Sequence, residues 1–241
     1  MSIRPYQPPD RGYYFVLNNC DIKIVRFTLE DNGFRDVRDT KSNDWTIYWQ
    51  TCAIKKPVYQ ALTRYQKVNH FPLSFYITRK DLMYRNISRL REMHGAKNFS
   101  FIPKTYILPQ EFMYLEDDLK REPNKLWICK PHASSQGRGI IVTNQISEIP
   151  QKPDKQYVCC EYIQNPLTFN GYKFDLRIYV ALTSVNPLRI YIYEEGLARF
   201  ATSKYQSQPS QQGFSKASKF MHLTNFSVNK KNLNFVSNTE D

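Results

Sequence analysis

Apolar residues in the first part of the chain fall into short runs that polar stretches separate. Residues 13–29 contain two such runs, broken by Asn18 and Asn19, and this pattern is typical of a strand, a turn and a second element. The segment WTIYW at 45–49 indicates another short strand of bulky residues. We therefore expect residues 1–70 to form a small N-terminal α/β domain.

The clearest helical pattern begins near residue 78. Thr78 and Asp81 have the spacing of a capping box, and Gly95 is a typical residue at a helix end. Between them, apolar residues recur at helical intervals: Leu82, Met83, Ile87, Leu90 and Met93. The pattern predicts a helix that packs through one face.

Residues 71–150 alternate between strand and helix patterns. The order predicts a strand at 105–108, a helix opening with Pro109, and strands at 125–130 and 139–143. We expect these elements to form a compact central α/β unit.

The segment 151–241 contains the longest strand patterns. A strand at 156–163 precedes a hairpin of residues 173–183 and 188–196, and we expect all three to form a second sheet. The Ser/Gln-rich residues 203–219 have no apolar period, which indicates a loop. The chain as a whole is therefore predicted to belong to the α/β (α+β) class, with two mixed sheets.

The charge balance indicates an acidic partner. The chain has 34 lysines and arginines against 22 acidic residues, which gives a formal net charge of +12. Nucleic acid, an anionic membrane and an acidic protein tail all fit this charge. No stacking or groove-reading motif indicates nucleic acid, and no window approaches the roughly 18 apolar residues of a membrane span.

The five cysteines form an odd set without the spacing of a metal site, and three of them lie in apolar runs. We expect reduced thiols in the core. The first residues contain no apolar stretch of signal-peptide length, so we expect a protein of the cytosol or nucleus. The set comprises Cys20, Cys52, Cys129, Cys159 and Cys160.

The segment WICKPHASSQGRGI at 127–140 leads from a strand holding Lys130 into a loop with small residues. Small residues let backbone N–H groups approach an anion, and Lys130 and Arg138 add positive charge. The segment lacks the GK[ST] of a P-loop, and glycine-containing hairpin loops are common. A phosphate-covering loop and an ordinary loop therefore both remain open at this point.

The strand at 173–182 carries two different faces. Its period of two places Lys173, Asp175 and Arg177 together, and we expect the apolar side chains of the other face to be buried. These apolar residues are Phe174, Leu176, Ile178 and Val180. The charged face is either a solvated surface with ion pairs or the floor of a polar cleft.

Four further polar residues are weaker candidates by themselves. Arg199 follows the hairpin, and Thr224, Asn225 and Ser227 cluster in a short segment. They are equally consistent with a surface arginine and with side chains that cap a turn. His132 and His222 have no partner at metal spacing, and we assign neither to catalysis.

Together these segments resemble the tubulin tyrosine ligase-like family of ATP-grasp amino-acid ligases, most strongly its glutamylating members. The resemblance runs through residues 67–86, 101–109, 127–140, 159–202 and 221–231. It implies an ATP-grasp-like fold in which two sheets flank a nucleotide cleft. Residues 71–150 would then be the central domain, and 151–241 an incomplete C-terminal domain.

The resemblance also implies roles for individual residues. Lys130 and Arg199 would be catalytic, and Arg199 and Ser227 would hold the incoming glutamate. The ATP-contacting positions would be Lys130, Gln136, Gly137, Cys160, Glu161, Tyr162, Ile163, Lys173, Phe174, Asp175, Thr224 and Asn225.

Three features depart from the family pattern. Cys160 stands where many members have glutamine or serine, and Phe226 stands where they usually have tyrosine. The carboxylates that hold magnesium in the family lie beyond the position of Asp241, so we expect no metal ligand in this chain.

The implied activity is that of a tubulin polyglutamylase. Such an ATP- and Mg²⁺-dependent acid–amino-acid ligase would join free L-glutamate to a γ-carboxylate in an acidic tubulin tail, through an acyl phosphate. Two alternatives stay open: a truncated, inactive fragment that binds nucleotide or tubulin, and a glycine or tyrosine ligase of the same family. We expect a monomer in the cytoplasm, on the cytoskeleton, with cilium or basal body as a further expected location.

Overall fold

The computed structural model describes residues 12–20, 22–39, 44–132, 134, 136–206 and 219–237. The chain divides into two compact units, Met1–Thr78 and Arg79–Asp241, which we describe separately. None of the helices in these described ranges has the length and apolarity needed to cross a membrane.

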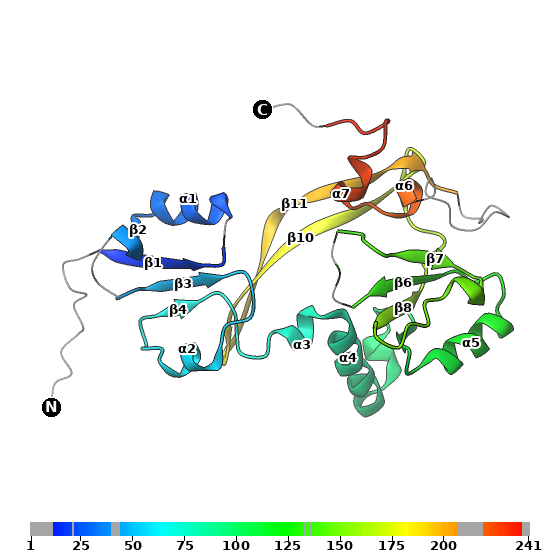
Figure 1. Ribbon diagram of the computed structural model, residues 1–241, viewed down its shortest axis with the longest axis horizontal. Helices are drawn as coiled ribbons and strands as arrows, with labels where there is room; N and C mark the ends of the chain where they lie inside the picture. The colour runs from blue at the N-terminus through cyan, green and yellow to red at the C-terminus, as the bar shows by residue number, and fades with distance from the viewer. Residues whose placement is uncertain are drawn as a thin grey trace. The chain divides into compact units, whose positions relative to one another are not determined.

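The first unit contains a four-stranded parallel sheet in the order β2-β1-β3-β4 (Figure 1). The expected strand, turn and second element at 13–29 are confirmed as β1, a turn and α1, and the expected strand at 45–49 is β3. The elements are β1 (Tyr13–Asn18), α1 (Lys23–Asp31), β2 (Phe34–Asp36), the 3-10 helix η1 (Val37–Asp39), β3 (Ile47–Gln50), α2 (Lys56–Gln60), β4 (Lys67–Val68) and α3 (Phe75–Thr78).

Asp36 is the buried charge of this first unit, with 4% of its surface exposed. Its carboxylate accepts hydrogen bonds from Arg26 Nη1 at 2.9 Å and from Arg38 Nη2 at 2.6 Å. The bonds from Arg38 outweigh the cost of burial and lower the pKa of Asp36 to about 2. The carboxylate therefore stays ionised and ties α1 to the segment after β2.

The second unit begins with the helix α4 (Lys80–His94), which ends at Gly95 as the sequence predicts. The predicted capping box is wrong. The N-cap is Arg79, and the Thr78 hydroxyl donates to the Ser74 carbonyl instead of to the helix. The expected apolar face is only partly buried, because Met83 and Met93 are exposed. The 3-10 helix η2 (Ala96–Phe99) follows.

A four-stranded antiparallel sheet, in the order β5-β8-β6-β7, forms the centre of the second unit (Figure 1). The strands predicted at 105–108, 125–130 and 139–143 are confirmed. The helix expected to open with Pro109 begins three residues later. The elements are β5 (Thr105–Leu108), α5 (Phe112–Arg121), β6 (Trp127–Pro131), β7 (Ile141–Thr143), η3 (Ile146–Glu148) and β8 (Tyr157–Glu161).

The strand expected at 156–163 does not join the second sheet. As β8 it lies between β5 and β6, hydrogen-bonded to both. Successive side chains of β8 point to opposite faces of the sheet. Cys159 packs in the core formed with Leu115 and Leu119 of α5, whereas Cys160 faces the opposite side. The hydrophobic pattern predicts a strand here, but it does not indicate which sheet receives it.

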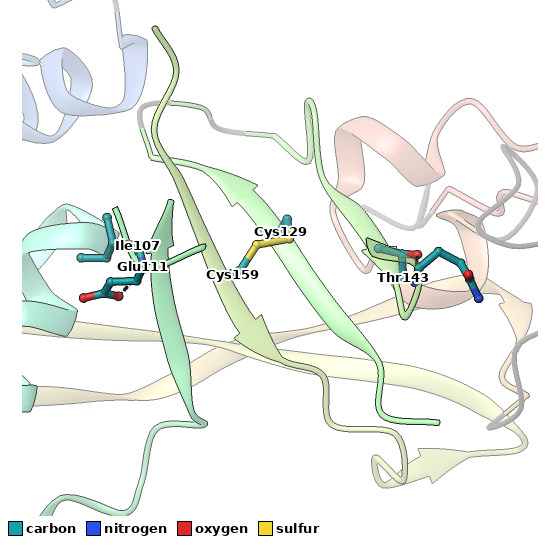
Figure 2. The surroundings of a disulfide bond; sticks show 6 residues. Ile107, Glu111, Cys129, Thr143 and Cys159 are labelled. Atoms are coloured by element: carbon teal, nitrogen blue, oxygen red, sulfur yellow. Dashed lines mark hydrogen bonds between the residues drawn. A yellow bond between two sulfur atoms is a disulfide. The ribbon is translucent and has the colours of Figure 1, made fainter. Parts of the chain in front are cut away.

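A disulfide joins Cys129 of β6 to Cys159 of β8 (Figure 2). The expectation that all cysteines are reduced core thiols is therefore wrong for this pair. The two residues are direct cross-strand partners with Cα atoms 4.1 Å apart, so alternation points both side chains to the same face. Cys20, Cys52 and Cys160 are free, but Cys52 is exposed and so is not a core residue.

The last strands form a three-stranded antiparallel sheet in the order β11-β10-β9. The predicted hairpin is confirmed by β10 (Tyr172–Val185) and β11 (Leu188–Lys204), which extend well beyond the short β9 (Thr168–Phe169) (Figure 1). The helices α6 (Lys219–His222) and α7 (Phe226–Asn229) follow and contact β11. The predicted loop at 203–219 begins later than expected, and its residues 207–218 lie outside the described ranges.

The apolar face predicted for this hairpin is not buried over most of its length. Leu176, Ile178 and Val180 are 60%, 52% and 59% exposed. Alternation is present, but no second layer within the described part of the unit covers this face. The combination of helices with one parallel sheet and two antiparallel sheets nevertheless confirms the α/β class.

Candidate functional site

Two adjoining cavities, of about 300 and 310 Å³, lie between the central sheet and its neighbours in the second unit. Both cavities are lined by Lys80 of α4, Ile128 and Lys130 of β6, and Lys173 of β10. Three lysines therefore gather where the cavities meet, which makes this border a strong candidate for anion binding.

The first cavity has a polar lining. The residues that line it in addition to the shared ones are Pro131, Ser134, Gln136, Gly137, Arg138, Ile140, His222, Leu223, Thr224 and Asn225. Backbone of a small-residue loop, two hydroxyls, an arginine and the three lysines are the groups that phosphate oxygens prefer. We call this space the polar cavity.

The loop over the polar cavity is held against α7. Gln136 and Gly137 both have positive φ values, of 61° and 74°. A Cβ atom on Gly137 would lie 2.7 Å from Val228 Cγ2, and Ser227 donates a hydrogen bond of 2.9 Å to the Gln136 carbonyl. Only glycine fits this contact, so the loop approaches the site as backbone.

Lys173 is a strongly perturbed base of the site. Its ammonium donates to the Tyr162 hydroxyl at 2.9 Å and to the His222 carbonyl at 3.0 Å. Burial, followed by the charge of Lys130, lowers the pKa of Lys173 to about 8. An anion bound here would relieve that repulsion, which is typical of a functional site.

Tyr162 and His222 form a buried polar pair beside this lysine. The phenol oxygen of Tyr162 lies 2.9 Å from His222 Nδ1. Burial, together with the Lys173 charge, lowers the pKa of His222 to about 4, so the imidazole is neutral at pH 7. Burial also raises the pKa of Tyr162 far above its usual range.

The second cavity is mainly apolar. Its further lining residues are Met83, Tyr84, Ile102, Pro103, Thr105, Val158, Cys160, Glu161, Tyr162 and Ile163. The amides of Glu161 and Tyr162 are bound within the fold, to the carbonyls of Lys104 and Leu126 at 2.8 Å each. The Glu161 carboxylate lies 3.2 Å from Lys125 Nζ. This apolar cavity suits a flat ring system, with backbone atoms at its edge.

Asp175 lies two residues along β10 from Lys173 and meets its cross-strand partner, Arg199 of β11. Arg199 donates to both carboxylate oxygens, and Thr224 donates to one of them at 2.8 Å. Burial opposes ionisation of Asp175, but Arg199 and Thr224 outweigh it, so the pKa of Asp175 is lowered.

Arg199 also lines a third cavity, of about 670 Å³. Thr224 lines both this cavity and the polar cavity, which makes the two spaces neighbours. Aromatic side chains supply much of the wall, and they are Phe169, Tyr172, Phe200, Phe226 and Phe235. A ligand with a carboxylate for Arg199 would fit here, next to whatever the polar cavity holds.

The structure brings together most of the residues that the sequence indicates. Lys130, Gln136, Gly137, Lys173, Thr224 and Asn225 line the polar cavity, and Cys160, Glu161, Tyr162 and Ile163 line the apolar cavity. Four residues fall outside both. Arg199 lines the third cavity and binds Asp175, and the other two are Phe174 and Ser227. The Phe174 ring packs on Phe200 with centroids 5.6 Å apart, and the Ser227 hydroxyl is bound to the loop.

Sequence reasoning missed Lys80 and His222. Lys80 donates a hydrogen bond of 3.1 Å to the Ser134 carbonyl and lines both cavities, although nothing in its helix pattern sets it apart from neighbouring basic residues. His222 received no role because it has no metal-spaced partner. Its proximity to Thr224 and Asn225 in the sequence was the available signal.

No group of three or more His, Cys, Asp or Glu side chains that could hold a metal ion occurs in the described part of the chain. The carboxylate nearest to the lysines, that of Asp175, is already bound by Arg199 and Thr224.

Comparison with known proteins gives consistent results. The sequence pattern of the tubulin-tyrosine ligase family matches residues 58–241. Tubulin polyglutamylase TTLL6 of Mus musculus is 42% identical over 220 residues, which are 91% of this chain and 26% of that protein. Tubulin polyglutamylase TTLL5 of Homo sapiens is 42% identical over 217 residues, 90% of this chain and 16% of that protein.

Tubulin monoglutamylase TTLL4 of Mus musculus is 41% identical over 218 residues, 90% of this chain and 18% of that protein. The chain thus spans 26% or less of the length of these curated relatives. Because the match covers residues 58–241 and the relatives agree, the chain belongs to the tubulin-tyrosine ligase family.

Proposed function

We propose that this chain is the nucleotide-binding part of an ATP-dependent ligase that joins free L-glutamate to a γ-carboxylate in an acidic tubulin tail. The observation that carries the proposal is the meeting of Lys80, Lys130 and Lys173 at the border of two cavities of opposite character. The names of the relatives supply tubulin and glutamate as the substrates.

ATP fits these cavities as a whole. Its phosphates would occupy the polar cavity, under the Gln136–Gly137 loop and among the lysines, and its adenine would occupy the apolar cavity. The amides of Glu161 and Tyr162 already donate hydrogen bonds within the fold. The groups that would form hydrogen bonds with the base are therefore the Glu161 carbonyl and the Ile163 amide. When bound, ATP supplies the phosphoryl group that activates a carboxylate.

The described residues do not offer a comparable site for Mg²⁺. We include Mg²⁺ as the metal ion that the family resemblance implies for this reaction.

The reaction has two steps. An oxygen of the acceptor γ-carboxylate attacks the γ-phosphorus, the bond to the bridging oxygen breaks, and an acyl phosphate and ADP result. The ammonium group of free glutamate loses one proton to water, and the resulting amine attacks the acyl carbon. The carbon–oxygen bond to the phosphate then breaks, and the nitrogen passes a second proton to the departing phosphate, which leaves an isopeptide bond and inorganic phosphate.

The residues of this chain would position the reactants. Lys130 and Lys173 would neutralise the charge on the phosphates, and the Gly137 backbone would cover them. Arg199 would hold a carboxylate of the incoming glutamate in the third cavity, with Asp175 fixing the guanidinium plane. Thr224 lies between the two spaces, where the two substrates must meet.

The net charge of +12 supports an acidic protein tail as the acceptor. We place the protein in the cytoplasm, on the cytoskeleton, and include the cilium or basal body as a further location. It would act as a monomer. Residues 1–70, 71–150 and 151–241 would be the N-terminal, central and C-terminal domains, with β8 contributed to the central sheet by the last of them.

Incorporation of labelled glutamate into tubulin tests the proposal, with this chain and the full-length enzyme measured in parallel. Lys130→Ala should abolish incorporation, whereas Lys97→Ala, an exposed lysine of η2, should leave it unchanged. ATP binding by a chain that incorporates nothing would favour the binding-fragment alternative. Incorporation of labelled glycine or tyrosine in place of glutamate would favour the other ligase chemistries.

A further inference from the structure

The side chain of Tyr162 is buried at the centre of the site, with 5% of its surface exposed. Its phenol oxygen lies 2.9 Å from Lys173 Nζ and 2.9 Å from His222 Nδ1. The ammonium also lies 4.6 Å from the centroid of the phenol ring. One side chain at the end of β8 therefore joins a residue of β10 to a residue of α6.

The direction of the hydrogen bond from Lys173 follows from the chemistry of the groups. An ammonium can only donate, so the phenol oxygen accepts from Lys173. Two further groups contact the phenol, and they are His222 Nδ1 and the Tyr205 hydroxyl. The phenol therefore holds the lysine on one side and is itself held on the other.

We infer that Tyr162 is a positioning residue whose hydroxyl holds the Lys173 ammonium at the border of the polar and apolar cavities, with His222 orienting that hydroxyl. Lys173 has three N–H groups, of which the Tyr162 oxygen and the His222 carbonyl take two. The third is assigned to a phosphate oxygen. This role rests on the proposed binding of ATP, and it differs from a backbone contact between Tyr162 and adenine.

Loss of the hydroxyl has two consequences for Lys173. The ammonium loses an acceptor that favours its charged form, while burial and Lys130 continue to disfavour that form. The side chain also loses the contact that selects its rotamer. The other titratable groups around these cavities and their buried pair are Lys80, Tyr84, Arg138, Cys160, Glu161, Asp175, Tyr205 and His222.

Calorimetric titration of Tyr162→Phe with ATP and with adenosine tests this role. The comparison of the two affinities distinguishes it from a general effect on the fold. The variant should bind ATP about tenfold or more weakly, since a hydrogen bond to a charged group is lost. Adenosine, which has no phosphate for Lys173, should bind unchanged. The matched control is Tyr106→Phe, which removes a hydroxyl bound to Asp118 at 2.6 Å on the α5 side of the sheet. It should leave both affinities unchanged.

The pH profile gives a second readout. Wild-type affinity for ATP should fall as the pH rises through about 8, where Lys173 loses its charge, and the fall should begin at lower pH in Tyr162→Phe. Lys173→Met should weaken ATP binding too, and combining it with Tyr162→Phe should add little, because both act on one ammonium.

Several results would overturn the inference. They are an equal loss of ATP and adenosine binding, an unshifted pH profile, or full additivity in the double variant. If Tyr162→Phe does not fold, the pH profile of ATP binding by His222→Phe replaces it, since the unoriented hydroxyl should also shift that profile downward. A wild-type chain that binds adenosine but not ATP would instead refute the proposed function itself.

Discussion

Asp175 of β10 and Arg199 of β11 are cross-strand partners, and the guanidinium donates two hydrogen bonds to the carboxylate, of 2.7 and 2.6 Å. Thr224 adds a third bond to the same carboxylate. The family resemblance assigns Asp175 to ATP, whereas its contacts in this structure are with the arginine assigned to glutamate. The pair therefore links the two substrate spaces, and its removal distinguishes between these roles.

Asp175→Asn should raise the KM for glutamate about tenfold while changing ATP affinity much less, because an amide cannot fix the guanidinium plane through two charged bonds. Steady-state kinetics with each substrate varied in turn measure this difference. Asp117→Asn, an exposed position on α5, is the control. A loss confined to ATP affinity would support the role implied by the family resemblance instead.

Gly137→Ala should weaken ATP binding about tenfold or more, because the added Cβ would lie 2.7 Å from Val228 Cγ2 and the loop must move away from the site. Combining it with Val228→Ala should restore part of the affinity, since the obstructing methyl group is gone. Equilibrium titration with ATP follows both variants.

The control for this loop is Gly95→Ala. Gly95 also has a positive φ, of 88°, but an added Cβ there would meet nothing within 4 Å. Gly95→Ala should therefore lower stability by backbone strain alone, roughly 1 to 3 kcal/mol, and leave ATP affinity unchanged. The explanation fails if both glycine variants bind ATP equally weakly.

Acid should destabilise the first unit through Asp36. The pKa of this carboxyl is about 2 in the folded chain, against 3.8 for the ordinary group. A depressed folded pKa contributes stability that is fully present above pH 4 and is lost as the pH falls toward 2. The contribution is roughly 1 to 2 kcal/mol, allowing for solvent screening of the exposed Arg38.

Hydrogen exchange of β1 between pH 5 and pH 2 measures this loss locally. Asp36→Asn should be less protected than wild type at pH 5 and should show little further loss toward pH 2. Asp31→Asn, on the exposed side of α1, should behave as wild type. Parallel acid profiles for wild type and Asp36→Asn would rule out this carboxyl as the cause.

The disulfide predicts a labelling pattern. After denaturation without reductant, alkylation should modify three cysteines, and after reduction it should modify all five. Intact-mass spectrometry counts the labels. Reduction should also lower the free energy of unfolding by about 3.6 kcal/mol in the chain-entropy account, given a sequence separation of 30 residues. Five labels before reduction would show that the bond is not formed.

Affinity for an acidic tubulin-tail peptide should fall as salt rises, since the attraction comes from a chain of net charge +12. Fluorescence anisotropy at two ionic strengths tests this prediction. A peptide of the same length with its glutamates changed to glutamines should bind weakly at both. Equal affinity for the acidic peptide at low and high salt would contradict the electrostatic proposal.

Much of the local structure could be predicted from the sequence. Strands 105–108 and 125–130 and the long hairpin follow from runs of apolar and β-branched residues, because such runs need a sheet to bury them. The charged alternation of Lys173 and Asp175 likewise indicates which face of β10 turns toward the site.

What could not be predicted depends on contacts between distant segments. The pairing of β8 with β6 brings Cys129 and Cys159 together, and it is invisible until the sheet is assembled. The same is true of Lys80, whose helix must lie beside the sheet before the lysine can line a cavity. Tyr162 is a third example, since its hydroxyl acquires a role only through Lys173 and His222.

Odd-numbered and even-numbered side chains of β6 lie on opposite faces of the central sheet. Trp127 and Cys129 of β6 face the α5 core, whereas Ile128 and Lys130 face the cavities. Insertion or deletion of a single residue in β6 would exchange these faces and place a lysine in the core and a cysteine in the cavities. Variation in length among natural relatives should therefore be excluded from this strand, even where substitutions within it are accepted.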